Sequence, residues 1–391
     1  MNSAGAAGRR MVLYSILSSR LTYAVNWYTT ASPALGLIAV AYHQPLAYDG
    51  LIASIFLLSV GVFQLPAGAL SAHFGSKQIS IAGLLILSLF NIFTPASPNY
   101  VILLFFRFIA GLGAALFFAP AIGVLSAFFS REERTGVIGL YNASFQLGAG
   151  ATLFFWPFID TKFGWQTGVI AGGALCLATA IVMLYSVDMR HATEQQTRRI
   201  NLSAMTQVLR SGTVWMVSLG FVGVWGAVTA ASQYLEQFGS SVLKLSPLLA
   251  GLLASLILFS GIAGGVLTGA LEKRTANMRR LLIATVVAFA LSMLLFEISN
   301  IVSVALAAIL TGALFTSGVS LTYALPAKLS SVSIENIPLA VSLVNSIQVL
   351  GGFWVPTLFG YMQANFGYPV TWASMAAISL AFLPFYVIMK I

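Results

Sequence analysis

The chain has 391 residues, of which 59% are hydrophobic and only 7% are charged, and its formal net charge is +9. This composition excludes an ordinary soluble domain, in which about 25% of the residues are charged. The positive charge does not indicate nucleic-acid binding, because the basic residues lie between apolar stretches and not on one polar face. We therefore expect a protein embedded in a bilayer, with membrane lipids and no nucleic acid as partners.

Apolar stretches long enough to cross a membrane follow one another along the whole chain. A hydrocarbon core about 30 Å thick needs about 20 apolar residues per helix. The sequence predicts an all-α polytopic membrane protein with twelve spanning helices. The expected helices cover residues 11–38, 48–71, 78–95, 99–127, 135–158, 165–187, 213–238, 247–271, 279–298, 301–326, 337–362 and 369–390.

Basic residues occupy every second gap between these stretches, and the opposite gaps hold only Lys162 and Lys244. Loops rich in lysine and arginine stay on the cytoplasmic side. We therefore expect a multi-pass protein of the cell (plasma) membrane with both termini in the cytoplasm. The basic residues in the alternate gaps and at the termini are Arg9, Arg10, Lys77, Arg131, Arg134, Arg190, Arg198, Arg199, Arg210, Lys273, Arg274, Arg279, Arg280, Lys328 and Lys390.

The longest hydrophilic stretch divides the chain into two halves of six helices each. We expect an N-terminal half over residues 1–187, a cytoplasmic linker over 188–212 and a C-terminal half over 213–391. The halves match each other at a spacing of about 203 residues, and a parallel repeat of this kind is typical of transporters. The matching pairs are Asn142 with Asn345, Gly164 with Gly367, and Glu132 with Glu335.

The loop between the second and third helices reads GALSAHFGSK. It resembles the signature loop of the major facilitator superfamily, in which a glycine is followed after three residues by Asp-Arg-x-Gly-x-Arg/Lys. The family's Asp and Arg are replaced by Ala72 and His73. The resemblance implies that this loop gates the cytoplasmic side, here without those two charges. The gating candidates are Gly68, Ala72, His73, Gly75 and Lys77.

The fourth helix carries RFIAGLGAA, in which Arg107 precedes a run of small residues. This segment is similar to a second signature of the same family, and Gly111, Gly113 and Ala115 match it. Small residues let helices approach each other closely in a membrane. The resemblance covers the whole chain and implies twelve helices around a central cavity, alternating access and a monomeric carrier.

Arg20 lies about nine residues into the first helix, roughly 13 Å deep at 1.5 Å per residue, and Arg107 also lies within a membrane-spanning segment. The acidic residues fall near helix ends or in loops on these spans, so no carboxylate lies comparably deep. Two cations without a carboxylate partner favour an anionic substrate, such as a small carboxylate. The alternative is that Arg20 reaches the inner headgroups and Arg107 binds helix carbonyls.

Other polar and aromatic side chains lie within the expected helices and are candidates to line a substrate cavity. Interhelical hydrogen bonds explain the amides equally well, and packing explains the aromatic residues. Together with Arg20 and Arg107, the substrate-binding candidates are Tyr23, Asn26, Trp27, Asn142, Gln146, Gln233, Tyr323, Asn345 and Gln348.

The histidines His43, His73 and His191 all fall in loops, so the helices lack an obvious proton carrier. Exchange of one anion for another, or facilitated diffusion, fits better than proton symport of a neutral metabolite. Efflux of amphiphilic drugs or lipids stays an alternative. The chain shows no GxxxxGK loop and no cluster of metal-ligating or catalytic residues at one depth, so we expect neither an enzyme nor a cofactor or metal.

Overall fold

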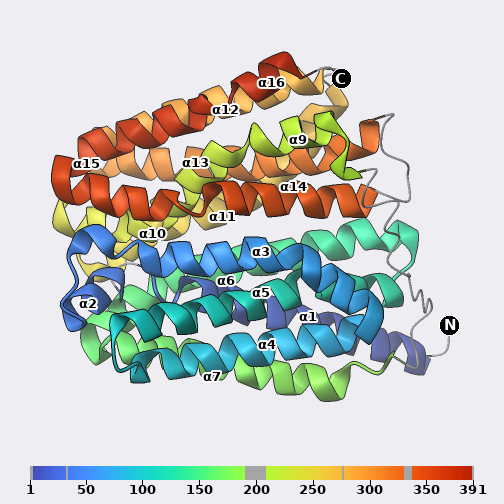
Figure 1. Cartoon of the computed structure of the whole chain (residues 1–391). Helices are drawn as coiled ribbons and strands as arrows, with labels where there is room; N and C mark the ends of the chain where they lie inside the picture. The colour runs from blue at the N-terminus through green and yellow to red at the C-terminus, as the bar shows by residue number, and fades with distance from the viewer. Residues whose placement is uncertain (1–2, 32–33, 190–207, 275–276, 330–336, 390–391) are drawn as a thin grey trace.

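A computed structural model describes residues 3–31, 34–189, 208–274, 277–329 and 337–389. Within these residues the secondary structure is helical, and nine stretches are long and apolar enough to cross a membrane. The helices form two bundles that lie side by side, as Figure 1 shows. The basic cluster Arg190, Arg198 and Arg199 of the predicted linker, and Glu335 of the predicted repeat, lie outside the described residues.

The N-terminal bundle contains the helices up to α7, and the C-terminal bundle contains those from α9 onwards. The N-terminal helices are α1 (Ser3–Tyr28), α2 (Ala34–Ala41), η1 (Leu46–Tyr48), α3 (Leu51–Phe74), α4 (Ser76–Phe93), η2 (Thr94–Ala96), α5 (Tyr100–Phe128), α6 (Arg131–Phe163) and α7 (Trp165–Ser186). The C-terminal helices are α9 (Gly212–Leu219), α10 (Val222–Ser241), α11 (Pro247–Arg274), α12 (Met278–Leu294), η4 (Leu295–Glu297), α13 (Ile301–Ala324), η5 (Leu325–Lys328), α14 (Ile337–Gly352), α15 (Val355–Ala381) and α16 (Pro384–Ile388).

Several predicted helices are interrupted in the structure. The predicted helix 11–38 is divided between α1 and α2, and the predicted helix 213–238 is divided between α9 and α10. The gap expected at residues 363–368 is present as a kink within α15. Gly367 has a non-helical φ of 78° there, so α15 is two helical segments joined at a kink. Hydropathy thus predicts the membrane crossings but not the breaks within them.

Polar side chains begin several of the helices. Asn99, Asn277 and Asn300 each accept a hydrogen bond from a backbone N–H three residues later, and they cap α5, α12 and α13. Ser130 and Glu133 form a capping box at the start of α6. Such residues satisfy the free N–H groups of a first helical turn, and they fix where each crossing starts.

Glycines let α5 pack closely on α3 and α4. A Cβ atom on Gly113 would lie 2.6 Å from the carbonyl oxygen of Gly83, and one on Gly111 would lie 2.8 Å from the Cβ of Ser59. Both distances are shorter than van der Waals contact. The small residues of the RFIAGLGAA segment therefore permit tight helix packing, as predicted.

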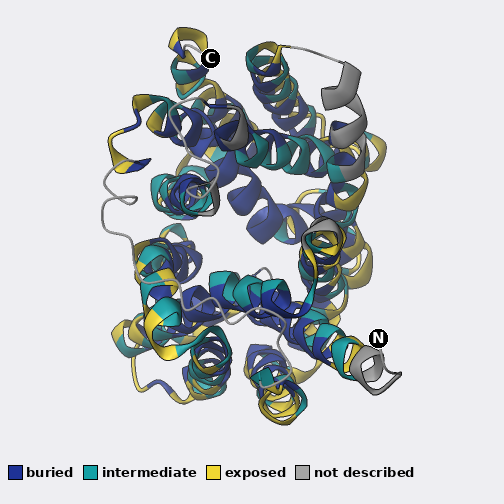
Figure 2. Ribbon diagram, turned by 90° about the vertical axis from the view of Figure 1, so that its right-hand side faces the viewer, coloured by how far each residue is buried: buried dark blue, intermediate teal, exposed yellow. Residues whose placement is uncertain are grey.

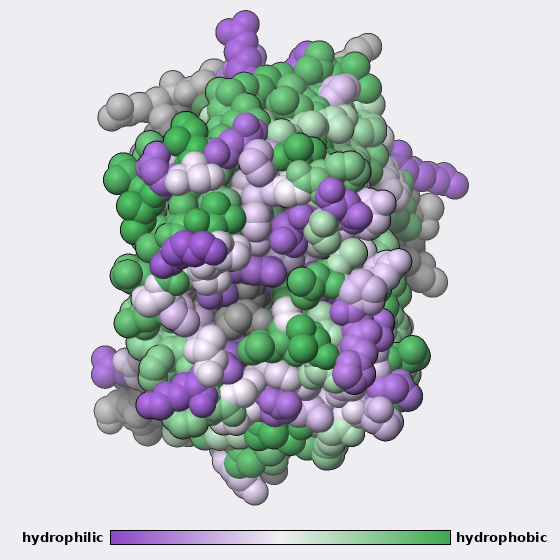
Figure 3. Space-filling view, turned by 90° about the vertical axis from the view of Figure 1, so that its left-hand side faces the viewer, coloured by the Kyte–Doolittle hydropathy of each residue, from purple (hydrophilic) through white to green (hydrophobic). Residues whose placement is uncertain are grey.

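The two ends of the molecule differ. The η1 end carries η1 and the turns at Gly164 and Gly367, and the linker end carries the turn at Gly75 and the start of α9. Gly164 and Gly367 have φ values of 88° and 78°, which favour glycine, so this pair of the predicted repeat shares a backbone conformation. Hydrophilic residues gather across the middle of the η1 end between hydrophobic residues at its sides (Figure 3). Figure 2 shows both bundles from the linker end.

Candidate functional site

The two bundles contact each other at the η1 end through buried polar groups. The hydroxyl group of Tyr234 on α10 donates a hydrogen bond to Oδ1 of Asp49, which directly follows η1. Tyr28 and Ser232 lie within hydrogen-bond distance of each other, at 3.3 Å between their hydroxyl oxygens. Asp49 is fully buried. These contacts join the N-terminal bundle to the C-terminal bundle and close this end of the interface.

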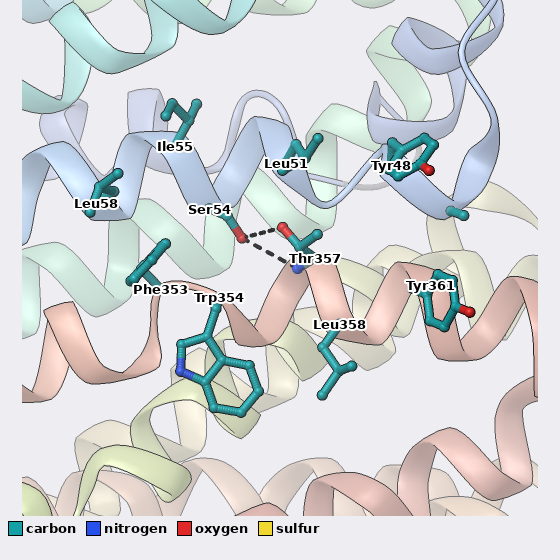
Figure 4. A pocket seen from close by; sticks show the side chains of 11 residues that line it. Tyr48, Leu51, Ser54, Ile55, Leu58, Phe353, Trp354, Thr357, Leu358 and Tyr361 are labelled. Atoms are coloured by element: carbon teal, nitrogen blue, oxygen red, sulfur yellow. Dashed lines mark hydrogen bonds between the residues drawn. The ribbon is translucent and has the colours of Figure 1, made fainter.

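A second contact at the same interface lies between α3 and α15. The hydroxyl oxygen of Ser54 lies 2.8 Å from that of Thr357 and 3.3 Å from the backbone nitrogen of Thr357. Ser54 and Thr357 also line an apolar pocket of about 410 Å³ between α3 and α15 (Figure 4). The pocket is lined by Ala47, Tyr48, Leu51, Ser54, Ile55, Leu58, Phe353, Trp354, Thr357, Leu358 and Tyr361.

Four aromatic rings surround the guanidinium group of Arg20. Its Cζ atom lies between 4.5 and 4.8 Å from the ring centroids of Tyr23, Phe118, Tyr141 and Phe145. Cation–π contacts of this kind stabilise a cation by about 0.5–2 kcal/mol each, but they accept no conventional hydrogen bond from its N–H groups. Among the described residues, the buried Nε and Nη1 atoms have no hydrogen-bond acceptor. Arg20 thus does not extend to the headgroups but is enclosed within the protein.

Residues of the C-terminal bundle face this aromatic site. The hydroxyl group of Tyr323 on α13 donates a hydrogen bond to Oδ1 of Asn345 on α14. The phenol of Tyr323 lies within electrostatic range of Arg20 of the opposite bundle. The structure therefore brings three of the predicted residues together across the interface between the bundles.

Arg107 has a different environment. Its Nη1 atom donates a 2.7 Å hydrogen bond to Oδ1 of Asn91 on α4, and its Cζ atom lies 4.5 Å from the ring centroid of Phe56. Asn91 in turn donates to Oδ1 of Asn26 on α1, which donates to the carbonyl oxygen of Gly172 on α7. The chain of hydrogen bonds links four helices of the N-terminal bundle, so the polar partner of Arg107 is an amide and not a helix carbonyl.

The remaining predicted residues are divided between the interior and the surface. Tyr23 and Trp27 are buried and pack with Phe145. Asn142 is exposed, whereas Gln146 donates a 3.2 Å hydrogen bond to Thr316 on α13 and so joins the two bundles.

Two further predicted amides are almost completely buried. Among the described residues, Oε1 of Gln233 and both side-chain polar atoms of Gln348 lack a hydrogen-bond partner. Buried amides usually have partners, so both side chains offer free polar atoms inside the protein.

The predicted gating loop forms the tight turn between α3 and α4. Gly75 has a φ of 95°, a value that glycine adopts without strain, and its N–H group bonds to the carbonyl oxygen of Ser71. His73 is exposed, whereas Ala72 and Lys77 are half-buried. A Cβ atom on Gly68 would meet nothing within 4 Å.

Arg9 on α1 and Glu133 on α6 form a 2.5 Å ion pair at the linker end. Glu133 precedes the membrane span expected at residues 135–158. The backbone N–H of Ser130 and the side chain of Arg9 lower the pKa of the exposed Glu133 carboxyl.

Sequence reasoning missed several residues of this interface. It placed Asp49, Asp160 and Glu236 near helix ends but did not expect them to be buried, as all three are. It also missed the rings around Arg20. Tyr141 and Phe145 are four residues apart on a predicted helix, beside Asn142, and that spacing places both on one face. The contact of that face with Arg20 depends on how α6 packs against α1, which no local pattern shows.

These features, two helical bundles with polar groups buried between them, are those of a membrane carrier. The Major Facilitator Superfamily profile matches residues 16–356, and the chain belongs to this family. The family fold has twelve spanning helices. In this structure α1 with α2, and α9 with α10, each form one crossing, and the two segments of α15 on either side of Gly367 belong to different crossings. The protein is thus a multi-pass membrane transporter and not an enzyme. Within the described residues, no three His, Cys, Asp or Glu side chains form a metal-binding group.

Curated relatives include transporters of several anions. The chain is 25% identical to a probable nitrate/nitrite antiporter of Thermus thermophilus over 81% of this chain and 77% of that protein. It is 25% identical to a nitrite extrusion protein of Bacillus subtilis over 95% of this chain and 93% of that one. A probable L-galactonate transporter of Escherichia coli is 25% identical over 56% of this chain and 52% of that protein.

Among solved structures, the chain is similar to a bacterial homologue of the human lysosomal transporter Spinster in an inward-facing and occupied conformation. The TM-score is 0.76 with 16% identity, and the alignment covers 97% of this chain and 96% of the other. At this level of identity the similarity concerns the fold alone.

Proposed function

We propose that this transporter carries a small organic anion, such as a carboxylate, and that Arg20 binds its negative charge. The observation that supports this most is the buried guanidinium group of Arg20, whose Nε and Nη1 atoms lack an acceptor among the described residues. Leaving a charge buried without hydrogen-bonded partners costs several kcal/mol. A carboxylate offers two acceptor oxygens that match the geometry of a guanidinium group.

The surroundings of Arg20 add selectivity to this site. Its aromatic rings leave the edge of the guanidinium plane as the part that can donate hydrogen bonds to a ligand. Tyr323 and Asn345 supply a hydroxyl and an amide from the opposite bundle. A ligand that contacts Arg20 and this pair would bridge both bundles, which is what a carrier needs to couple binding to bundle movement. The related nitrate/nitrite antiporter and L-galactonate transporter, by their names, carry anions as well.

We further propose that transport proceeds by alternating access, as exchange or facilitated diffusion. The hydrogen bonds Asp49–Tyr234 and Ser54–Thr357 close the η1 end. If the basic linker end is cytoplasmic, as the loop charges predict, the end closed by these contacts faces away from the cytoplasm. Separation of the bundles at the η1 end would then produce the outward-open state.

One observation favours a second candidate function, efflux of amphiphilic compounds. The pocket between Leu51, Ser54 and Leu358 is lined almost entirely by apolar surface. An amphiphile could enter the interface there from the bilayer. Arg20 has no special role in this alternative, so its replacement distinguishes the two functions.

The test is thermal unfolding of the purified protein with a panel of mono- and dicarboxylates, inorganic anions, neutral sugars and lipophilic cations. A ligand that binds only the folded state stabilises it by about 2.7 kcal/mol at a hundredfold excess over Kd. Stabilisation by carboxylates that disappears in Arg20→Ala and persists in the exposed control Arg10→Ala supports the proposal. Stabilisation by lipophilic cations alone would contradict the anion proposal and favour efflux of amphiphilic compounds.

A further inference from the structure

Asp49 is an acidic residue in an unusual position. Its side chain is fully buried at the η1 end, where the two bundles meet. Oδ1 accepts the hydrogen bond from Tyr234 of the opposite bundle, whereas Oδ2 is buried and has no hydrogen-bond partner among the described residues. A charged carboxylate needs partners for both oxygens, and burying it without them is costly. A protonated carboxyl group avoids most of this cost because it carries no charge.

Among the described residues, the groups that act on Asp49 do not include a cation. The groups near it are the backbone N–H of Gly50 and the neutral phenols of Tyr234 on α10, Tyr100 on α5 and Tyr368 on α15. Helix α2, which packs on η1, carries no titratable side chain, and His43 after it is exposed. The other buried carboxyl groups at this end are Glu236 and Asp160, which interact with each other and whose charges would be negative.

We propose that the carboxyl group of Asp49 is a proton-binding site that holds a proton while the η1 end is closed and releases it when the bundles separate there. The site is independent of the proposed substrate, because it rests on the contact between the bundles and not on Arg20. Asp49 lies at the η1 end, so the proton enters and leaves from the water on that side. The site therefore adjusts the opening of this end and does not carry protons across the membrane.

The sign of the pH effect follows from proton linkage. In the open state Asp49 faces water and ionises near the ordinary aspartate value of about 3.9. The closed state then binds one proton more than the open state between that value and the pH at which the buried carboxyl group itself loses its proton. Low pH favours the state that binds more protons. The ratio of open to closed molecules should rise with pH, by at most about tenfold per pH unit for a single proton.

The experiment measures the separation of the bundles directly. Spin labels are attached to Gln166→Cys and Val242→Cys, two exposed positions at the η1 end on opposite bundles, in a Cys176→Ala background. Distances between the labels are recorded by double electron–electron resonance in lipid nanodiscs, without substrate, between about pH 5 and about pH 8. We expect a longer-distance population that grows as the pH rises.

The variants separate Asp49 from its neighbours. Asp49→Asn keeps an acceptor for Tyr234 but cannot ionise, so it should stay closed at every pH. Tyr234→Phe removes the donor but keeps the carboxyl group, so the pH-dependent shift should persist, as it should in Asp160→Asn. A distance distribution of the wild-type protein that does not change with pH would overturn the proposal. A pH-dependent shift that persists in Asp49→Asn would also overturn it, whatever the result for Tyr234→Phe and Asp160→Asn.

Because the labels report opening without any ligand, failure here is independent of the anion proposal. A wild-type protein that no carboxylate stabilises would contradict the anion proposal and leave the pH response of Asp49 unchanged. Conversely, a pH-insensitive η1 end would leave anion binding at Arg20 intact.

Discussion

The guanidinium group of Arg107 lies 2.7 Å from Oδ1 of Asn91, and this amide is also bonded to Asn26. Arg107 thus has an amide acceptor for Nη1, although its Nε atom has none, whereas neither Nε nor Nη1 of Arg20 has an acceptor among the described residues. Two arginines that look equivalent in the sequence therefore have different environments. Arg107 belongs to the hydrogen-bond chain of the N-terminal bundle, and Arg20 is the cation that we propose binds a ligand.

Replacement of Asn91 by leucine should destabilise the protein strongly. The change leaves the buried Arg107 cation without its acceptor and removes a donor from Asn26, which should cost about 3–5 kcal/mol. The cost appears in the free energy of unfolding in detergent. Asn365→Ala is the matched control, because the Asn365 amide is exposed and bonds only the carbonyl oxygen of Tyr361 in its own helix. If both variants unfold alike, the Arg107 hydrogen bond contributes nothing to stability.

Arg20→Lys should weaken carboxylate binding almost as much as Arg20→Ala does. Lysine keeps the charge but has no planar pair of donors, so it cannot bind a carboxylate in the same way. Binding to liposome-reconstituted protein should fall at least about tenfold, which corresponds to about 1.4 kcal/mol. Full binding by the lysine variant would show that charge alone is sufficient and that the guanidinium geometry is irrelevant.

Tyr323→Phe should reduce affinity for the same ligand by a smaller factor. The change removes one hydroxyl group beside Arg20 and frees Oδ1 of Asn345, which corresponds to about 1 kcal/mol or a few-fold in Kd. Equilibrium binding of a radiolabelled carboxylate measures it. Tyr185→Phe, which changes an exposed hydroxyl on α7, should bind like the wild type. An unchanged Kd in Tyr323→Phe would remove the C-terminal bundle from the proposed site.

Ala72→Asp restores the acidic residue of the family signature in the turn between α3 and α4. It should strengthen closure at the linker end and shift the carrier towards the state that is open at the η1 end. Accessibility of cysteine probes to a membrane-impermeant thiol reagent should rise at the η1 end and fall at the linker end. The same accessibility at both ends as in the unmodified protein would contradict this role.

Gly113→Val and Gly68→Ala should have opposite effects on stability. A Cβ atom on Gly113 overlaps the backbone of α4, so the variant forces α4 and α5 apart and should cost about 1–3 kcal/mol. A Cβ atom on Gly68 meets nothing, and alanine favours a helix interior by about 0.5–1 kcal/mol. Thermal unfolding of both variants checks the pair. A destabilised Gly68→Ala would indicate a packing role for Gly68 that this conformation does not contain.

The fold was predictable because crossings of a bilayer depend on length and hydropathy, which are local properties. The stretch 99–127, for example, corresponds to α5 almost to the residue, since Asn99 caps it. The break between α1 and α2 coincides with the sequence TTASP at residues 29–33, whose hydroxyl residues and proline are a local signal that hydropathy averaged over a whole crossing does not register. The family was indicated by Gly75 and by the run that begins at Arg107, whose residue types follow from turn geometry and helix packing.

The candidate site was predictable only in part. Depth along a helix identified Arg20 and Arg107 as embedded cations, but it did not distinguish them, since their partners come from other helices. The distinction requires knowing that Asn91 faces Arg107 and that Phe145 faces Arg20. In the same way, Asp49 lies near the end of a predicted helix, and its burial results from α10 and α15 covering it from the other half of the chain.

By itself, the sequence determined that this protein spans a membrane, has twelve crossings in two related halves and belongs to a family of carriers. These properties follow from hydropathy, repeat spacing and short motifs, all of which can be read from the linear sequence without knowing which helices are in contact. Tertiary structure alone decided which cation is enclosed by aromatic rings, which amides are bonded and which carboxyl group is buried between the bundles. Those outcomes depend on contacts between helices far apart in the chain, and desolvation and hydrogen bonding at such contacts are set by packing.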